Sequence, residues 1–181
     1  MNIIEQAEKI RADLIKRVED SYCEPNRSRA LKALKAPISL NKRMRTSAGR
    51  AFRLELRIEL NQRLFEKPSN SKNIQGLERT VIHEFAHLMD WLMYGNFGHG
   101  ATWKRIMRKM GQPDHRCHNL DTTGLKRRHK TIFLAECDCS DSKPIRRKWV
   151  NHIRKGGNVI CKTCESRVSI VGETVNWLKT G

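Results

Sequence analysis

Hydrophobic residues with helical spacing mark three segments of the chain. Apolar side chains recur every three or four positions over residues 3–18, 74–92 and 101–110, which places them on one face of a helix. Pro25 follows the first segment and cannot continue a helical hydrogen-bond ladder. We therefore predict an N-terminal scaffold helix, a long buried central helix that is broken at residues 95–100, and a shorter third helix.

A different pattern occupies residues 53–60, where apolar and charged residues alternate. The apolar positions are Leu54, Leu56, Ile58 and Leu60, and the charged ones are Arg53, Glu55, Arg57 and Glu59. A period of two is typical of a strand with one buried face, so we predict a strand here, with Gly49 marking the hairpin that leads into it. A helix over 51–65 is the alternative, because Leu, Glu and Arg are good helix formers.

From residue 132 onward, short strand-like stretches lie between pairs of cysteines. Cys137-x-Cys139 is followed, after 21 residues, by Cys161-x-x-Cys164. Four thiolates in two close pairs are typical of a tetrahedral structural zinc site, and the segment between them, with its Gly156-Gly157 turn, is expected to be the hairpin of a zinc ribbon. Because the first pair is C-x-C and not the commoner C-x-x-C, a site in which His152 replaces one cysteine remains an alternative.

Size and composition favour one compact domain with a small appendage. The chain has 181 residues, of which 38% are apolar and 30% charged, so a large multidomain enzyme and a disordered chain are excluded. Neither an apolar run of about 18 residues nor the order of a signal peptide occurs, so we expect a cytoplasmic protein without membrane contact. A monomer is favoured. The cysteines are then expected as thiols or metal ligands, with Cys23 a core thiol and Cys117 without an assigned role.

The charge balance points to a polyanionic partner. Lysine and arginine number 36 against 19 acidic residues, a net charge of +17, and the sequence pI is about 10.1. Such an imbalance is typical of nucleic-acid-binding proteins, although a merely soluble basic surface is the simpler alternative.

The central helix carries the strongest catalytic motif, His83-Glu84-Phe85-Ala86-His87. Residues four apart lie one turn apart on a helix, so both imidazoles can reach one metal ion while Glu84 faces the open coordination position. A pair of helix histidines satisfied by neighbouring groups is the structural alternative. Asp90, one turn after His87, could orient that ring, but an exposed helix aspartate is the favoured interpretation.

A catalytic zinc ion needs a third protein ligand. His99 is the best candidate, because it lies beyond a glycine-containing break that would let the chain return over the helix. His115, Cys117 and His118 compete for this role. With three neutral imidazoles, zinc would acidify a water molecule, and Glu84 would take its proton and pass it to a leaving amine. We therefore expect two zinc ions per chain, one catalytic and one structural.

The segment between the cysteine pairs is also the best candidate for nucleic-acid contact. Between Ser142 and Cys164 the chain has basic and aromatic residues but no acid. Cations can bind phosphates and a ring can stack on a base, which favours single-stranded or frayed DNA. Packing of the tryptophan inside the ribbon is the alternative. The candidate contacts are Arg146, Arg147, Lys148, Trp149, Arg154 and Lys155.

These motifs together resemble the SprT family, whose eukaryotic relative is the Spartan protease. The resemblance rests on the His83–His87 motif, on Gly98-His99-Gly100-Ala101-Thr102-Trp103, and on the four-cysteine ribbon enclosing Ile145-Arg146-Arg147-Lys148. It implies that His83, His87 and His99 hold the catalytic zinc and that Glu84 is the catalytic glutamate. Spartan-like members are DNA-dependent proteases that act on proteins crosslinked to DNA.

We therefore predict an α+β architecture with a zincin-like metallopeptidase domain over residues 1–131 and a zinc ribbon over 132–175. The expected function is DNA-stimulated hydrolysis of DNA-bound or DNA-crosslinked proteins, in DNA–protein crosslink repair. The competing hypothesis is a non-catalytic zinc-ribbon factor that binds nucleic acid or associates with transcription.

Overall fold

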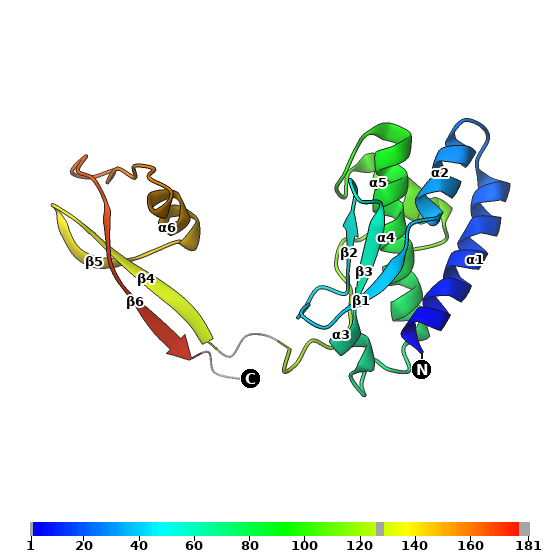
Figure 1. Cartoon of the computed structure of the whole chain (residues 1–181), viewed down its shortest axis with the longest axis horizontal. Coiled ribbons are helices and arrows are strands. Elements are labelled where there is room, and N and C mark those ends of the chain that lie inside the picture. The colour runs from blue at the N-terminus through cyan, green and yellow to red at the C-terminus, as the bar shows by residue number, and fades with distance from the viewer. Residues whose placement is uncertain (1, 126–128, 178–181) are drawn as a thin grey trace. The chain divides into compact units, whose positions relative to one another are not determined.

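The computed structural model describes residues 2–125 and 129–177. Across these residues the chain is mixed α/β, with six helices and two three-stranded sheets. It divides into two compact units, one up to residue 126 and one from residue 127 (Figure 1). In the described ranges, no helix combines the length and the apolar character needed to cross a membrane.

The predicted helices of the first unit are confirmed. Its helices are α1 (Ile3–Ser21), α2 (Asn26–Leu34), α3 (Gln62–Glu66), α4 (Ile74–Tyr94) and α5 (Ala101–Lys109). Asn2 caps α1 by accepting a hydrogen bond from the backbone N–H of Glu5, and Asn73 caps α4 in the same way through Gly76. Gly95 ends α4 in the left-handed conformation, with φ of 71°.

The first unit also contains the sheet formed by β1 (Ile38–Asn41), β2 (Gly49–Phe52) and β3 (Arg57–Asn61). β3 lies in the middle, parallel to β1 and antiparallel to β2. The predicted strand therefore exists, but it begins four residues later than the alternation suggested.

The residues before β3 form the hairpin turn instead of a strand. Gly49 begins β2, so the turn lies at residues 53–56 and not at Gly49. Leu54 is 79% exposed at this turn and Leu56 has a positive φ of 46°, whereas Ile58 and Leu60 are fully buried. The alternation in the sequence begins before the strand does, because a tight turn can leave a leucine exposed to solvent. The helix over 51–65 is wrong for this hairpin, and only α3 at its end is helical.

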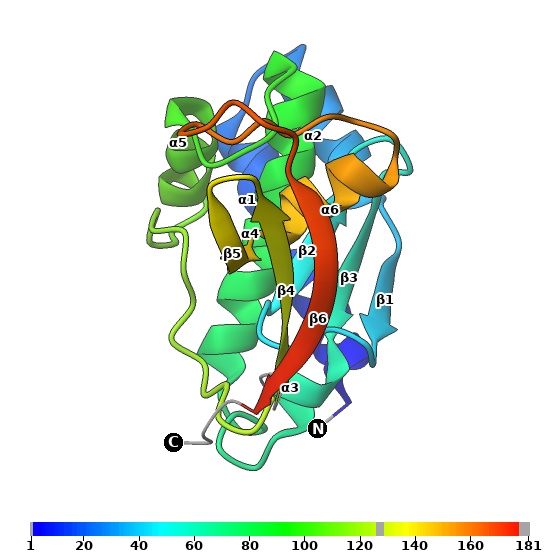
Figure 2. The same cartoon turned by 90° about the vertical axis from the view of Figure 1, so that its left-hand side faces the viewer.

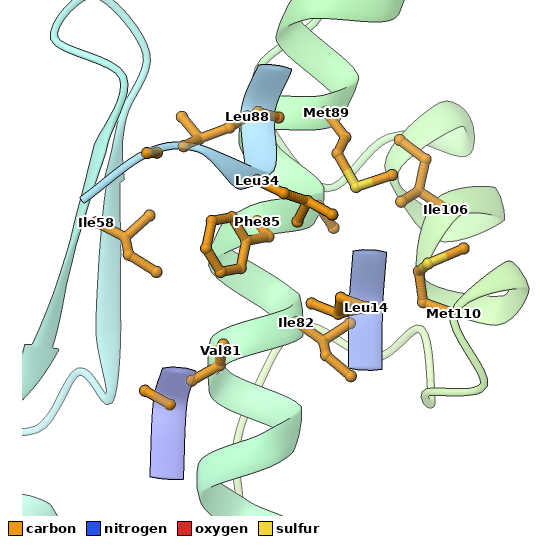
Figure 3. Packing of buried hydrophobic residues seen from close by; sticks show 14 of the residues in the cluster. Leu14, Leu34, Ile58, Val81, Ile82, Phe85, Leu88, Met89, Ile106 and Met110 are labelled. Carbon is orange, nitrogen blue, oxygen red and sulfur yellow. The ribbon is translucent and has the colours of Figure 1, made fainter. Parts of the chain in front are cut away.

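The core of the first unit surrounds α4. Figure 3 shows Phe85 of α4 between Ile58 of the sheet on one side and Leu14 of α1 and Leu34 of α2 on the other. Ile106 and the rest of the apolar face of α5 complete the packing. Because α4 is enclosed on several sides, its polar residues are held in fixed positions.

Cys23 is not the predicted core thiol. It is exposed, just beyond the last residue of α1, and the neighbouring Tyr22 is buried in its place. The end of the helix turns the Cys23 side chain to solvent, a detail that apolar spacing alone does not resolve.

The second unit is a small sheet covered by one helix. β4 (His129–Cys137) lies between β5 (Ser140–Ile145) and β6 (Ser169–Trp177), and both pairings are antiparallel (Figure 2). β4 thus begins before residue 132, the predicted start of the ribbon. The predicted hairpin between the cysteine pairs is wrong, because residues 147–154 form the helix α6 (Arg147–Arg154).

Packing explains why α6 is a helix. Val150 is fully buried and Phe133 of β4 is 2% exposed, so one apolar side chain and an aromatic ring give the helix a small buried face. The other face is basic. Trp149, which the alternative placed inside the ribbon, is 42% exposed.

Candidate metal centres

Three histidines of the first unit converge. His83 and His87 lie one turn apart on α4, and His99 lies in the segment between α4 and α5. One ring nitrogen from each lies within 4.8 Å of the others, and the Nε2 atoms of His83 and His99 are 3.0 Å apart. Zinc–nitrogen bonds of about 2.0–2.1 Å in a tetrahedron separate the nitrogens by about 3.3 Å, so these residues fit a zinc ion.

Trp103 supports all three rings. It is fully buried near the start of α5, and its ring centroid lies 4.7 Å from that of His83, 5.5 Å from His87 and 4.6 Å from His99. The turn at Gly95 lets the chain reverse, and the packing of Trp103 against α4 then brings His99 back over the helix. Sequence spacing does not predict this direct contact of Trp103 with the histidines.

Burial keeps the histidines neutral. The pKa of His83 is lowered from 6.5 to about 3, first by burial and then by the charges of His87 and His99. The pKa of His87 is lowered to about 4, mainly by burial, although the backbone of Gly98 raises it. Neutral imidazoles are the form that binds a metal ion, so at neutral pH the site needs no deprotonation before binding.

Glu84 lies beside this cluster in a tightly enclosed position. It is 6% exposed, and burial raises its pKa from 4.5 to about 8, although the backbone N–H of Ala51 and the charge of Arg50 both lower it. β2 approaches closely, because a Cβ atom on Gly49 would lie 2.7 Å from Cγ and Oε1 of Glu84. A carboxyl group with a pKa near neutrality can both accept and release a proton.

A cleft of about 290 Å³ gives access to these groups. His83, Glu84 and His99 line it, together with residues 46–49 before and at the start of β2 and residues 116–118 after α5. A reacting group in this cleft would therefore meet the histidine nitrogens and the carboxyl group of Glu84.

The segment after α5 is held against the cleft by two side chains. Arg79 of α4 donates through Nη2 to the carbonyl oxygens of His115 and Cys117, each at 2.7 Å. His118 donates through Nε2 to the carbonyl of Thr46 at 2.8 Å, and its Nδ1 accepts from the N–H of Leu120 at 3.2 Å. These bonds fix one wall of the cleft.

The competing third ligands lie outside the histidine cluster. Among the described residues, His83, His87 and His99 form a group of possible ligands, and His115, Cys117 and His118 do not join it. Both ring nitrogens of His118 are engaged elsewhere. Sequence reasoning missed Arg79 and the positioning role of His118, since only the long-range return of residues 115–118 brings them to the cleft.

Asp90 is not the exposed helix residue that was favoured. It is 1% exposed, and neither carboxylate oxygen makes a hydrogen bond within the described residues. Burial raises its pKa, while the nearby Thr102 hydroxyl and Arg105 lower it. In the sequence, the position of Asp90 one turn after His87 was the only sign that it lies buried near the histidines.

The four cysteines of the second unit also converge. Their Sγ atoms lie within 4.8 Å of one another; Cys139 lies 3.6 Å from Cys137 and 3.8 Å from Cys161. Zinc–sulfur bonds of about 2.3 Å in a tetrahedron separate the sulfurs by about 3.8 Å, so these residues fit a structural zinc ion. His152 does not join the group, which leaves four cysteines as the candidate ligand set.

A tight turn supplies the second cysteine pair. The N–H of Glu165 donates to the carbonyl of Cys161 at 3.1 Å, and Glu165 has a positive φ of 56°. Ser166 Oγ lies 3.0 Å from Sγ of Cys164 and lowers the pKa of that thiol to about 6. A thiol that ionises readily is a better zinc ligand.

The six predicted nucleic-acid contacts gather on α6 and its two flanking residues, and all are exposed. The guanidinium groups of Arg147 and Arg154 lie 4.7 and 5.3 Å from the ring centroid of Phe133, and the ammonium of Lys148 lies 4.7 Å from that of Trp149. Three of the cations therefore contact aromatic rings.

The fold and its two sites define a mixed α/β protein with one candidate metal centre of three histidines and another of four cysteines. The SprT-like family model matches residues 12–129, and the chain belongs to this family.

Curated relatives extend this similarity. Protein SprT of Pseudomonas fluorescens strain SBW25 is 31% identical over 162 residues, which cover 87% of this chain and 94% of the relative. Protein SprT of Pseudomonas savastanoi pv. phaseolicola is 33% identical over 131 residues, which cover 70% and 76%. No solved structure matches the chain significantly.

Proposed function

We propose that the chain is a zinc-dependent, DNA-stimulated protease of zincin-like architecture that hydrolyses DNA-bound or DNA-crosslinked proteins. One observation carries the proposal: three imidazoles converge beside a cleft that His83, His99 and Glu84 line. Membership of the SprT-like family supports the zinc-dependent, protease-like part of this proposal.

The three histidines would hold zinc through their neutral ring nitrogens. Zinc held there would supply a Lewis acid that polarises a scissile carbonyl and acidifies a water molecule. Glu84 then accepts a proton from water and delivers it to the leaving amine. The N–H of Ala51 helps to hold this carboxyl group in place.

The basic helix α6 would bring DNA to the enzyme. Its exposed cations lie beside the half-exposed Trp149, whose ring can stack on an unpaired base. The net charge of +17 adds attraction to phosphates. This attraction should weaken steeply as the salt concentration rises. This favours single-stranded or frayed DNA as the stimulating partner.

The direct test is the Glu84→Gln variant of the full chain. Digestion of a histone would be followed with and without single-stranded DNA, and native mass spectrometry would count zinc. We expect the variant to keep two zinc ions and to lose about 10²–10⁴-fold in cleavage rate, the contribution of general acid–base catalysis. We also expect DNA stimulation of the wild type to fade between low and moderate salt.

Glu19→Gln is the matched control, because Glu19 lies exposed on α1, outside the cleft residues. It should cleave like the wild type. Equal inactivity of wild type and Glu84→Gln, with DNA binding intact, would contradict the protease and favour a non-catalytic nucleic-acid-binding factor. Cleavage that does not respond to DNA would contradict the DNA-dependent part alone.

A further inference from the structure

Asp90 is a buried acidic residue on the same helix face as two candidate zinc ligands. It follows His87 by three residues and His83 by seven on α4, so all three side chains lie near one line along the helix. It is 1% exposed, and neither of its oxygens has a hydrogen bond of good geometry in the described part of the chain, although the Thr102 hydroxyl and the charge of Arg105 lie close enough to lower its pKa. A buried carboxylate that is paired only this weakly is costly, which suggests that it has a task.

Two buried donors nearby also lack acceptors. Nδ1 of His87 and Nε1 of Trp103 make no hydrogen bond with the described residues. The two rings stack, with their centroids 5.5 Å apart. Trp103 directly follows Thr102, whose hydroxyl lies near Asp90. Two donors and two acceptor oxygens without a hydrogen bond therefore belong to His87, to Trp103 stacked beside it and to Asp90 one turn further along α4.

Metal binding gives these groups a reason to pair. A histidine that binds through Nε2 carries its proton on Nδ1, and this N–H needs an acceptor that fixes the ring orientation. The side chains of Met89 and Met93, near Asp90 on α4, are buried and apolar and cannot serve. The carbonyl of Gly98 is the competing acceptor, because the Gly98 backbone already raises the pKa of His87.

We propose that Asp90 is a positioning residue that accepts the Nδ1–H of His87 across one ordered water molecule, and thereby orients His87 toward zinc. Asp90 touches neither the substrate nor the reacting atoms, so its effect passes through the affinity and geometry of the metal site. The inference rests on the proposed function, because it needs zinc at the three histidines.

The test measures zinc affinity in the full chain by competition with a chelator. Loss of such an outer carboxylate typically weakens metal binding about 10–100-fold, so we expect that loss at the histidine site in Asp90→Ala. Asp90→Asn should fall between Asp90→Ala and the wild type, because its amide oxygen still accepts a hydrogen bond but carries no charge. The four-cysteine site should keep its affinity in every variant and serves as an internal reference.

Stability of the zinc-free chain separates the positioning role of Asp90 from a purely structural one, which predicts that its replacement lowers stability. Asp90→Asn in the zinc-free chain should be at least as stable as the wild type, because it removes a buried charge. With cobalt in place of zinc, the visible spectrum of the histidine site should change in Asp90→Ala.

The matched control is Asn70→Ala. Asn70 is 2% exposed and hydrogen-bonds to Leu64 and Asp121, so its loss should lower stability but leave zinc affinity unchanged.

The outcomes separate this inference from the function on which it rests. If the wild type binds zinc at the histidine site and Asp90→Ala binds it equally well, Gly98 is the acceptor and the role of Asp90 is refuted. If the wild type binds zinc only at the cysteines, the proposed function and this inference both fail.

Discussion

At the scale of single residues, the catalytic proposal depends on how closely β2 approaches Glu84. Gly49 leaves room for the carboxyl group, because a Cβ atom there would lie 2.7 Å from Oε1 of Glu84. Ala51, two residues further, donates its N–H to the same group. The start of β2 therefore sets both the position and the proton affinity of Glu84.

Gly49→Ala should displace Glu84 without disturbing the three histidines. A misplacement of about 1 Å can cost on the order of 10²-fold in rate, so we expect a loss of that size in kcat with two zinc ions still bound. Steady-state cleavage kinetics and a zinc count check this. Gly172→Ala is the matched control, since a Cβ atom at Gly172 meets nothing within 4 Å. Unchanged kcat in Gly49→Ala would remove Glu84 from the mechanism or show that β2 moves freely.

The titrating groups of α4 act in opposite directions on stability. Glu84 has a folded pKa of about 8, above its ordinary 4.5, so its contribution is present at low pH and lost as pH rises toward 8. His83 and His87 have folded pKa values of about 3 and 4, below their ordinary 6.5, so their contribution is present above 6.5 and lost as pH falls.

The zinc-free chain should therefore be most stable near pH 6.5. Between pH 6.5 and 8 Glu84 lowers the free energy of unfolding by about 1–2 kcal/mol, from 1.36 kcal/mol per pKa unit, and the last deprotonation of the histidines in the unfolded chain offsets part of this decline. Urea unfolding of the chelator-treated protein at both pH values measures this decline. Glu84→Gln should show much less of it. Wild-type stability that rises with pH over this interval would contradict the burial of Glu84.

At the scale of elements, the sequence predicts a segment more accurately when more of its side chains are buried. α4 was predicted closely because its apolar residues face neighbours on several sides and so repeat with helical period. The turn at residues 53–56 was not predicted, because Leu54 fits the alternating pattern of the strand although its side chain is exposed. α6 was taken for a hairpin since Val150 is its single fully buried side chain, too little to produce a periodic signal.

The same reasoning explains which parts of the candidate site were foreseen. His83, Glu84 and His87 follow from spacing within one helix, and His99 from a glycine break close by. Arg79 and the wall of the cleft at residues 115–118 depend on a long-range return of the chain that no local pattern encodes. Asp90 was misjudged for a related reason, because its burial comes from packing outside α4.

At the scale of the whole molecule, the two units divide the proposed work. The first carries the three histidines and Glu84, and the second carries four cysteines and a basic helix. The second unit has few buried apolar side chains among its described residues, so a zinc ion at the cysteines would contribute much of its folding free energy. The positive charge is spread over both units, and both would contribute to attraction toward DNA.

The central claim is that His83, His87 and His99 hold a metal ion that Glu84 faces. Anomalous diffraction at the zinc edge from crystals of the full chain tests it most directly. We predict two peaks, one among the four cysteine sulfurs and one about 2.0–2.1 Å from a nitrogen of each histidine, with the carboxyl group of Glu84 turned toward it. A chain with zinc at the cysteines and none at the histidines, or with Glu84 turned away, would contradict the account.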